Sequence, residues 1–404
     1  MTNLNDALKG ITVLDFSQVG AGPTCGMLLG DLGARVVKVE APGGDIGRKL
    51  GPPWQNGESV VSMSFNRNKR SLAIDLKKHD GPALLRRLTK QVDVVIESFR
   101  PGVMERLGID YPTLRAINPA LVFCSVSAYG QTGPWRDKPG VDGIVQAVSG
   151  LMSNIGDARS PPMKVPVPVV DMTTAYLATT AVMAALRVRD ATGEGQHVDV
   201  SLYNSAVMLQ QSAVASYLSS GEKPIRSGSA APYSAPNEAY PTQDGWIMIA
   251  AYHVDRWPKF CEVIGNPALA MDDRFATIAS RVKNRDALMH EITQCLATHG
   301  SQAWQDKLEA ADIICGPIAD YDMLAASPQM IHNGVIVETH NVDAGVVHMP
   351  GAAFGDRDAQ SRVHYGPPAV GEHSRDVLAE FDVAADEIDA LIAMGTVKQR
   401  KETP

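Results

Sequence analysis

Short apolar segments alternate with helix-compatible stretches along the first half of the chain. The first segment, residues 11–16, is followed by a glycine-rich turn at 20–23. A helix-compatible stretch then leads to a valine-rich segment at 35–40, and Pro23 suits the first turn of the intervening helix. This pattern predicts a strand–helix–strand unit, which is the building block of a parallel sheet.

The same alternation continues through residue 201. Strands are predicted at 71–75, 92–96, 121–126 and 196–201, and helices at 82–90 and from Asp171 onward. Alternating strands and helices favour an α/β fold whose parallel sheet is doubly wound, with helices on both faces.

The chain is too long for one hydrophobic core. It has 404 residues, and single cores usually stop growing at roughly 250–300 residues. The composition turns rich in Ser, Pro, Gly and Ala at 223–241, which predicts a linker or binding loop. We therefore expect a large domain that begins at 1–222, a smaller α+β domain at 223–330, and a segment at 331–404 that completes the large domain.

Composition excludes several classes of function. The formal net charge is −8, so no general positive field attracts nucleic acid or anionic lipid. The five cysteines are scattered and odd in number, which is typical of reduced thiols in a cytoplasmic protein. The chain opens without a signal-peptide pattern, and its longest apolar run, 175–186, is shorter than a membrane span and predicts a buried helix.

The turn after the first strand partly matches a dinucleotide fingerprint. Gly20 and Gly22 fit, and Glu40 follows at a suitable distance, but Cys25 occupies the place of the third glycine. A nicotinamide-dependent oxidoreductase is therefore one alternative, and a turn without a ligand is another. A turn beside a helix N-terminus also suits a phosphate or a thioester. No complete zinc motif or serine-hydrolase elbow occurs, so no metal site is expected.

Asp171 is the most informative single residue. It follows the apolar tract 165–170 and opens an apolar helix. One interpretation is an N-cap aspartate. The other is a covalent nucleophile, because a carboxylate at a buried helix start is well oriented for attack.

Motifs along nearly the whole chain resemble the class III CoA-transferase family, which also includes carnitine CoA-transferase, formyl-CoA transferase and the α-methylacyl-CoA racemases. The matching segments are 10–16, 21–23, 32–34, 37–40, 42–43, 68–71, 99–102, 118–119, 127–130, 133–134, 161–162, Asp171, 192–200 and 371–373. Each is weak by itself, but they occur in the family's order.

The resemblance implies a Rossmann-like large domain, a small domain, and two chains interlocked as a homodimer. It implies that Asp171 attacks an acyl-CoA thioester to give a mixed anhydride and then an aspartyl-CoA thioester, with support from Asp142. An acyl-CoA and a small carboxylic acid are then the substrates, and no tightly bound cofactor is expected.

The resemblance also implies where CoA binds. The residues involved are Val19, Gly20, Ala21, Ile74, Lys77, Ser98, Phe99, Arg106, Lys138 and Gly140. For the three cations, a solvated surface charge is the alternative interpretation. The backbone amides around Gly20 are expected to approach a developing oxyanion.

A racemase is the nearest alternative within the family. Racemases carry a Gly-His-Asp motif, whereas this chain has Val141 between Gly140 and Asp142, and valine cannot transfer a proton. Glu238 resembles another racemase acid and keeps that alternative open. A non-catalytic CoA-binding homologue is expected to lose the nucleophile. The sequence does not identify the acyl donor or the acceptor, whose specificity we expect in the loops 153–164 and 228–240.

Overall fold

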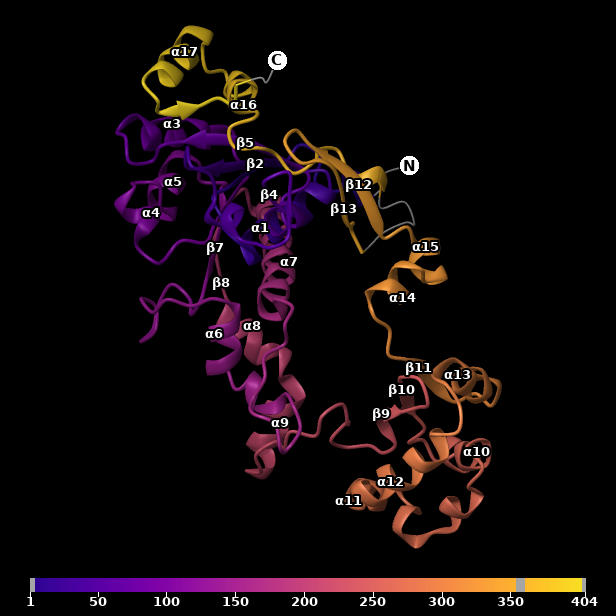
Figure 1. The fold of residues 1–404 in the computed structure, drawn as a ribbon. Coiled ribbons are helices and arrows are strands. Elements are labelled where there is room, and N and C mark those ends of the chain that lie inside the picture. Colours follow the sequence, from indigo (N-terminus) through magenta and orange to yellow (C-terminus); the bar gives the residue numbers. More distant parts are fainter. Residues whose placement is uncertain (1–3, 354–359, 402–404) are drawn as a thin grey trace. The chain divides into compact units, whose positions relative to one another are not determined.

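The computed structural model describes residues 4–353 and 360–401 (Figure 1). The chain forms two compact units. The large unit comprises the described parts of 1–151, 164–221 and 328–404, and the small unit comprises 152–163 and 222–327. Residues 152–163 differ from the expected assignment to the large domain. The reason is a local pairing: Gly228 donates to the Gly156 carbonyl, and Arg226 donates to the carbonyls of Asp157 and Ser160.

The large unit is built on a parallel sheet, as predicted. Its strands are β1 (Thr12–Asp15), β2 (Arg35–Glu40), β5 (Lys69–Ile74), β6 (Val94–Glu97), β7 (Val122–Ser127), β8 (His197–Ser201) and β14 (Val397–Lys398). Their order is β14-β5-β2-β1-β6-β7-β8, and only β14 runs antiparallel to its neighbour within this sheet of the described residues.

The strand order reverses between β1 and β6. From β1 the chain proceeds to β2 and β5 on one side, and from β6 to β7 and β8 on the other. At such a reversal the loops after neighbouring strands diverge and leave a crevice at the carboxyl ends, where ligands of doubly wound sheets bind. The loops that follow Asp15 and Glu97 therefore flank the expected binding crevice.

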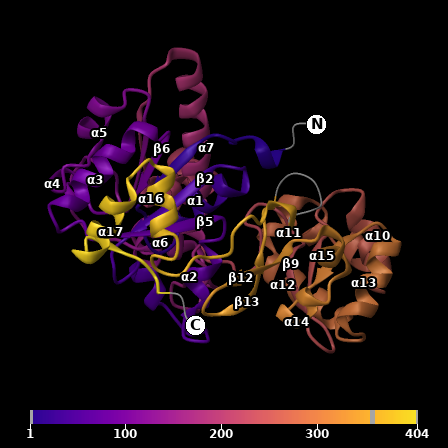
Figure 2. The same cartoon turned by 90° about the horizontal axis from the view of Figure 1, so that it is seen from above.

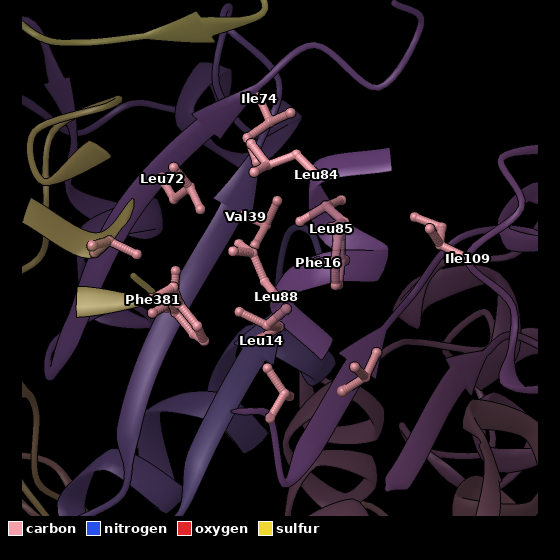
Figure 3. Packing of buried hydrophobic residues seen from close by; sticks show 14 of the residues in the cluster. Leu14, Phe16, Val39, Leu72, Ile74, Leu84, Leu85, Leu88, Ile109 and Phe381 are labelled. Atoms are coloured by element: carbon pink, nitrogen blue, oxygen red, sulfur yellow. The ribbon is translucent and has the colours of Figure 1, made fainter. Parts of the chain in front are cut away.

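Helices cover both faces of this sheet because successive strand residues point to opposite sides. Val13 and Val36 pack with α1 (Ala21–Asp31), α6 (Asp142–Val148), α7 (Val169–Thr192) and α8 (Leu202–Leu209). Leu14 and Val39 pack with the helices of the other face (Figure 3). Those helices are α3 (Asp80–Leu88), α4 (Val103–Arg106), α5 (Tyr111–Ile117), α16 (Ser374–Glu380) and α17 (Ala385–Ala393), and Figure 2 shows α16 and α17 from above.

The helix that starts near Asp171 is longer and less buried than predicted. By length and composition α7 qualifies as a membrane span, the one such helix among the described residues, with 44% of its most apolar 18-residue window buried. Its inner side packs on α1, whereas Tyr176, Met183 and Val188 are exposed. The predicted buried helix therefore has one apolar side that the described residues of the large unit do not cover.

The small unit is an α+β arrangement. Its sheet has the order β11-β10-β9, with β9 (Asn237–Pro241), β10 (Trp246–Ala250) and β11 (Ile314–Pro317) paired antiparallel. Tyr240, Phe260 and Trp304 are buried in a core shared with the helices. These helices are α10 (Arg256–Val263), α11 (Ile278–Lys283), α12 (Arg285–Leu296) and α13 (Ser301–Ala310).

Candidate active site

Asp171 lies in the first turn of α7, with its carboxylate against Gly20 of the β1–α1 turn. A Cβ atom added to Gly20 would lie 2.5 Å from Asp171 Oδ2. The contact therefore exists only because residue 20 has no side chain. It places the carboxylate at the point where the strand order reverses, so the structure brings together two residues predicted from sequence.

Asp142, rather than Asp171, caps the start of α7. Its Oδ2 accepts hydrogen bonds from the backbone N–H groups of Val170 at 2.8 Å and Asp171 at 3.1 Å. The N-cap interpretation of Asp171 is therefore wrong, since a residue from α6 satisfies these donors. The Asp171 carboxylate accepts no hydrogen bond from any described residue, so no donor of the described chain occupies its oxygens.

The surroundings of Asp171 disfavour its negative charge. Burial, and then the nearby Asp142 carboxylate, raise the pKa of Asp171 to about 7. A carboxylate with a raised pKa is more basic, and hence a stronger nucleophile, than an ordinary aspartate once it is deprotonated. Near neutral pH, both protonation states of Asp171 are populated.

The turn beside Asp171 has an unusual backbone. Val19 has a φ of 68°, a left-handed conformation that is rare for a β-branched residue and costs about 1–3 kcal/mol. The Asp45 carboxylate holds it by accepting from Val19 N–H at 3.3 Å. Lys38 donates from Nζ to Asp45 at 3.0 Å and to the Ser17 carbonyl at 3.1 Å. The buried ion pair of Lys38 and Asp45 thus holds the β1–α1 turn in this conformation.

Ser98 joins this turn to the neighbouring strand. Its Oγ accepts from Gln18 N–H at 2.8 Å, across the gap between the loops after β1 and β6. The N–H groups of Gly20 and Ala21 have no acceptor among the described residues, because they precede the first internal bond of α1. Gly20 itself lies against the Asp171 carboxylate.

The other predicted CoA-contact residues are spread over the large unit. Lys77, Arg106 and Lys138 are exposed, and Lys138 Nζ lies 4.4 Å from the centroid of the Trp135 ring. Gly140 packs closely on Ala128, and Phe99 is partly buried against the core. The Ile74 side chain is fully buried (Figure 3), so a nucleotide at this strand end would meet backbone instead.

Glu238 lies in the small unit and is already neutralised. It is fully buried, forms an ion pair with Arg285, and accepts a 2.5 Å hydrogen bond from the Tyr240 hydroxyl. These partners give Glu238 a structural role in the unit where it lies.

Sequence reasoning missed three residues that hold the site in place, namely Lys38, Asp45 and Gln146. Gln146 Nε2 donates to Asp142 Oδ1 at 2.6 Å. The sequence could have indicated this contact, because residues four positions apart on one helix are neighbours. Lys38 and Asp45 carried no comparable signal, because their partner is the backbone of a distant turn.

Comparison with known proteins gives a consistent result. The sequence model of CoA-transferase family III matches residues 8–374. A succinate–glutarate CoA-transferase from Agrobacterium fabrum is 38% identical over 398 residues, covering 95% of this chain and 97% of that protein. A succinyl-CoA:mesaconate CoA-transferase from Haloarcula hispanica is 39% identical over 337 residues, covering 79% and 85%. The crystal structure of a CaiB/BaiF family protein from Brucella suis has a TM-score of 0.85 at 33% identity and covers 94% of this chain and 100% of that one.

Proposed function

The chain belongs to CoA-transferase family III, and we propose that it transfers CoA to a dicarboxylic acid through covalent intermediates on Asp171. The enzyme moves CoA from an acyl-CoA thioester to a carboxylic acid, as the family and its named relatives do. The dicarboxylate class is supported by the glutarate and mesaconate in the names of those relatives.

The proposed reaction proceeds by successive acyl exchanges. A carboxylate oxygen of Asp171 attacks the thioester carbonyl, the C–S bond breaks, and an acyl-aspartyl anhydride and CoA thiolate result. The thiolate attacks the Asp171 carbonyl, releasing the donor acid and leaving an aspartyl-CoA thioester. The acceptor carboxylate attacks this thioester, which gives an anhydride of the acceptor with Asp171 and again releases the thiolate. The thiolate then attacks the acceptor's carbonyl in this anhydride, forms the acceptor's CoA thioester and restores Asp171. Each step exchanges one activated acyl bond for another.

The observation that carries this proposal is the state of the Asp171 carboxylate. It lies against Gly20 at the crevice, and its pKa is raised to about 7. It accepts no hydrogen bond from any described residue. An aspartate with a purely structural role would be paired or would cap its own helix. The N–H groups of Gly20 and Ala21 supply the complementary stabilisation of the oxyanion.

Mass spectrometry after incubation with succinyl-CoA tests the covalent route. We expect an adduct on the Asp171 peptide with the mass of CoA less one water, which hydroxylamine removes. Asp171→Ala should give no adduct and no turnover. Turnover by this variant, or an adduct on a different residue, would refute the mechanism and leave the family assignment intact.

The racemase alternative receives no support from the site. Val141 is the N-cap of α6, next to Asp142, and has no titratable group. We expect no exchange of the α-proton of a 2-methylacyl-CoA with deuterated water.

The assembly and location are part of the same proposal. The resemblance implies an interlocked homodimer, and exposed apolar residues on α6, α7, α8 and α9 (Gln211–Ser220) support a second copy as the partner of the large unit. They include Ile144, Tyr176, Met208 and, with 76% of its surface exposed, Leu218. Five unpaired cysteines fit a cytoplasmic location, and the net charge of −8 argues against binding to nucleic acid or to anionic membranes.

A further inference from the structure

Lys164 is an exposed cation whose side chain lies against Gly143, the residue that follows Asp142. Its side chain lies over the start of α6. A Cβ atom on Gly143 would be 3.7 Å from Lys164 Cδ and 3.9 Å from its Nζ. Gly143 directly follows Asp142 in sequence, so the ammonium group lies next to the residue that caps α7.

The backbone at Lys164 is fixed to the same network as the nucleophile. Gln146 is fully buried, and its amide brackets the next residue: Oε1 accepts from Val165 N–H at 2.9 Å, and Nε2 donates to the Val165 carbonyl at 3.2 Å. The same Nε2 donates to Asp142, which in turn receives the Asp171 N–H. A continuous chain of hydrogen bonds thus connects the backbone next to Lys164 with the backbone of Asp171.

Lys164 has no ionic partner within the described chain. It is exposed and forms no ion pair there, whereas Lys38 and Lys69 beneath the β1–α1 turn are buried in pairs with Asp45 and Asp15. Arg48 is likewise paired with Glu40. These three cations are therefore already neutralised, and Lys164 is not.

The site is otherwise unfavourable for a dianion. Asp142 and Asp171 present two carboxylates, and the charge of Asp142 adds to burial in raising the pKa of Asp171. One carboxylate of a dicarboxylic acid must approach Asp171 to react, and its second carboxylate then needs a positive partner nearby. A lysine is suited to this task because its flexible stem accommodates acids of different length.

We propose that Lys164 binds the non-reacting carboxylate of the acid substrate and so selects dicarboxylates over monocarboxylates. This inference rests on the proposed function. It assigns specificity to one residue, at the end of the 153–164 loop in which sequence analysis expected the acceptor determinants.

The test compares glutarate with its monomethyl ester as acceptors of CoA from succinyl-CoA. The two acids react through the same carboxylate and differ in charge at the other end. The quantity measured is the ratio of their kcat/KM values at one donor concentration, so that any change in donor binding cancels. The variants are Lys164→Met, which keeps the length but removes the charge, Lys164→Gln, and Lys164→Arg, which keeps the charge. Lys9→Met is the matched control. Lys9 is an exposed lysine just before β1, at the amino ends of the parallel strands and therefore opposite the loops of the site.

We expect wild type and Lys9→Met to prefer glutarate. Lys164→Met and Lys164→Gln should lower the ratio by about ten- to a hundred-fold through a higher KM for glutarate, as the loss of a charge-assisted hydrogen bond implies. Lys164→Arg should retain most of the preference. A wild-type enzyme that uses both acids equally, or a Lys164→Met enzyme that keeps the wild-type ratio, overturns the inference alone. Absence of wild-type transfer to either acid counts against the dicarboxylate acceptor in the proposed function and, with it, this inference.

Discussion

At the scale of single residues, the absence of a side chain at position 20 matters as much as the presence of one at position 171. In Gly20→Ala, the new methyl group would overlap Asp171 Oδ2, whose short side chain can yield only by rotating away from the turn. A displacement of about 1 Å at a reacting group can lower a rate roughly a hundred-fold. We therefore expect a folded enzyme whose kcat falls about a hundred-fold.

Gly43→Ala is the matched control for that prediction, because nothing lies within 4 Å of the added methyl group. The melting temperatures of both variants and their rates of adduct formation from succinyl-CoA should be measured together. If Gly20→Ala forms the adduct as fast as Gly43→Ala, the contact does not position the nucleophile.

The pH dependence of transfer reports the charge state of Asp171. The folded-state pKa of about 7 is well above the ordinary 3.8, so the attacking form is lost as pH falls through 7. We expect kcat/KM to rise with pH to a plateau, with an acid limb near 7. Asp142→Asn removes a neighbouring negative charge, which lowers the pKa of Asp171 and shifts the limb to lower pH.

The test depends on the pH at which the acid limb of kcat/KM lies, and not on the plateau value of kcat/KM. An asparagine cannot accept from both Gln146 and the start of α7 as the carboxylate does, so the plateau should fall as well. Burial is the larger cause of the raised pKa, and the shifted limb should therefore stay above 3.8. A limb that stays in place or moves to higher pH would show that Asp142 does not act on Asp171 through its charge.

At the scale of secondary-structure elements, the sequence predicted the strands better than the contacts between them. The predicted strand at 35–40 coincides with β2, because its three valines favour the extended backbone of a strand. The two-residue β14 was too short to give a pattern. The left-handed backbone of Val19 was also unpredictable, since it depends on Asp45, which the fold brings close. Asp171 and Asp142 were both candidates from the sequence, but the capping of α7 by Asp142 was unpredictable because Asp142 lies on another helix.

The short helix α4 carries the prediction for the nucleotide end of CoA. Arg106 ends this helix and is exposed, as a phosphate contact requires. Arg106→Ala should weaken CoA and acyl-CoA alike by about one to two decades, since a charge-assisted contact contributes roughly 1.5–3 kcal/mol. Binding isotherms for CoA and dephospho-CoA at fixed salt measure this. Lys90→Ala is the control, because Lys90 is exposed and lies just before β6, at the amino ends of the parallel strands. Equal CoA affinity in Arg106→Ala and wild type would mean that Arg106 is a solvated charge.

At the scale of the whole molecule, the uncovered apolar side of the large unit argues for a second copy. The exposed residues of α7, α8 and α9 surround a hollow of about 630 Å³ lined by Leu177, Met208 and Leu209. Large apolar surface patches are uncommon on monomers and are typical of interfaces. Because a homodimer interface pairs the same surface on both subunits, one substitution alters both halves of the contact.

Met208→Glu should therefore weaken the dimer, because it places a charge from each subunit in an apolar interface where no partner compensates it. The matched control is Met271→Glu in the small unit, where the methionine is even more exposed, at 86% against 58% for Met208. Light scattering coupled to gel filtration should give about twice the chain mass of 43.2 kDa for wild type and Met271→Glu. Because interlocked chains separate only when they partly unfold, Met208→Glu should lower the temperature at which the dimer is lost, and Met271→Glu should not. A wild-type mass of one chain would contradict the homodimer. A Met208→Glu dimer as heat-stable as wild type would place the interface on a different surface.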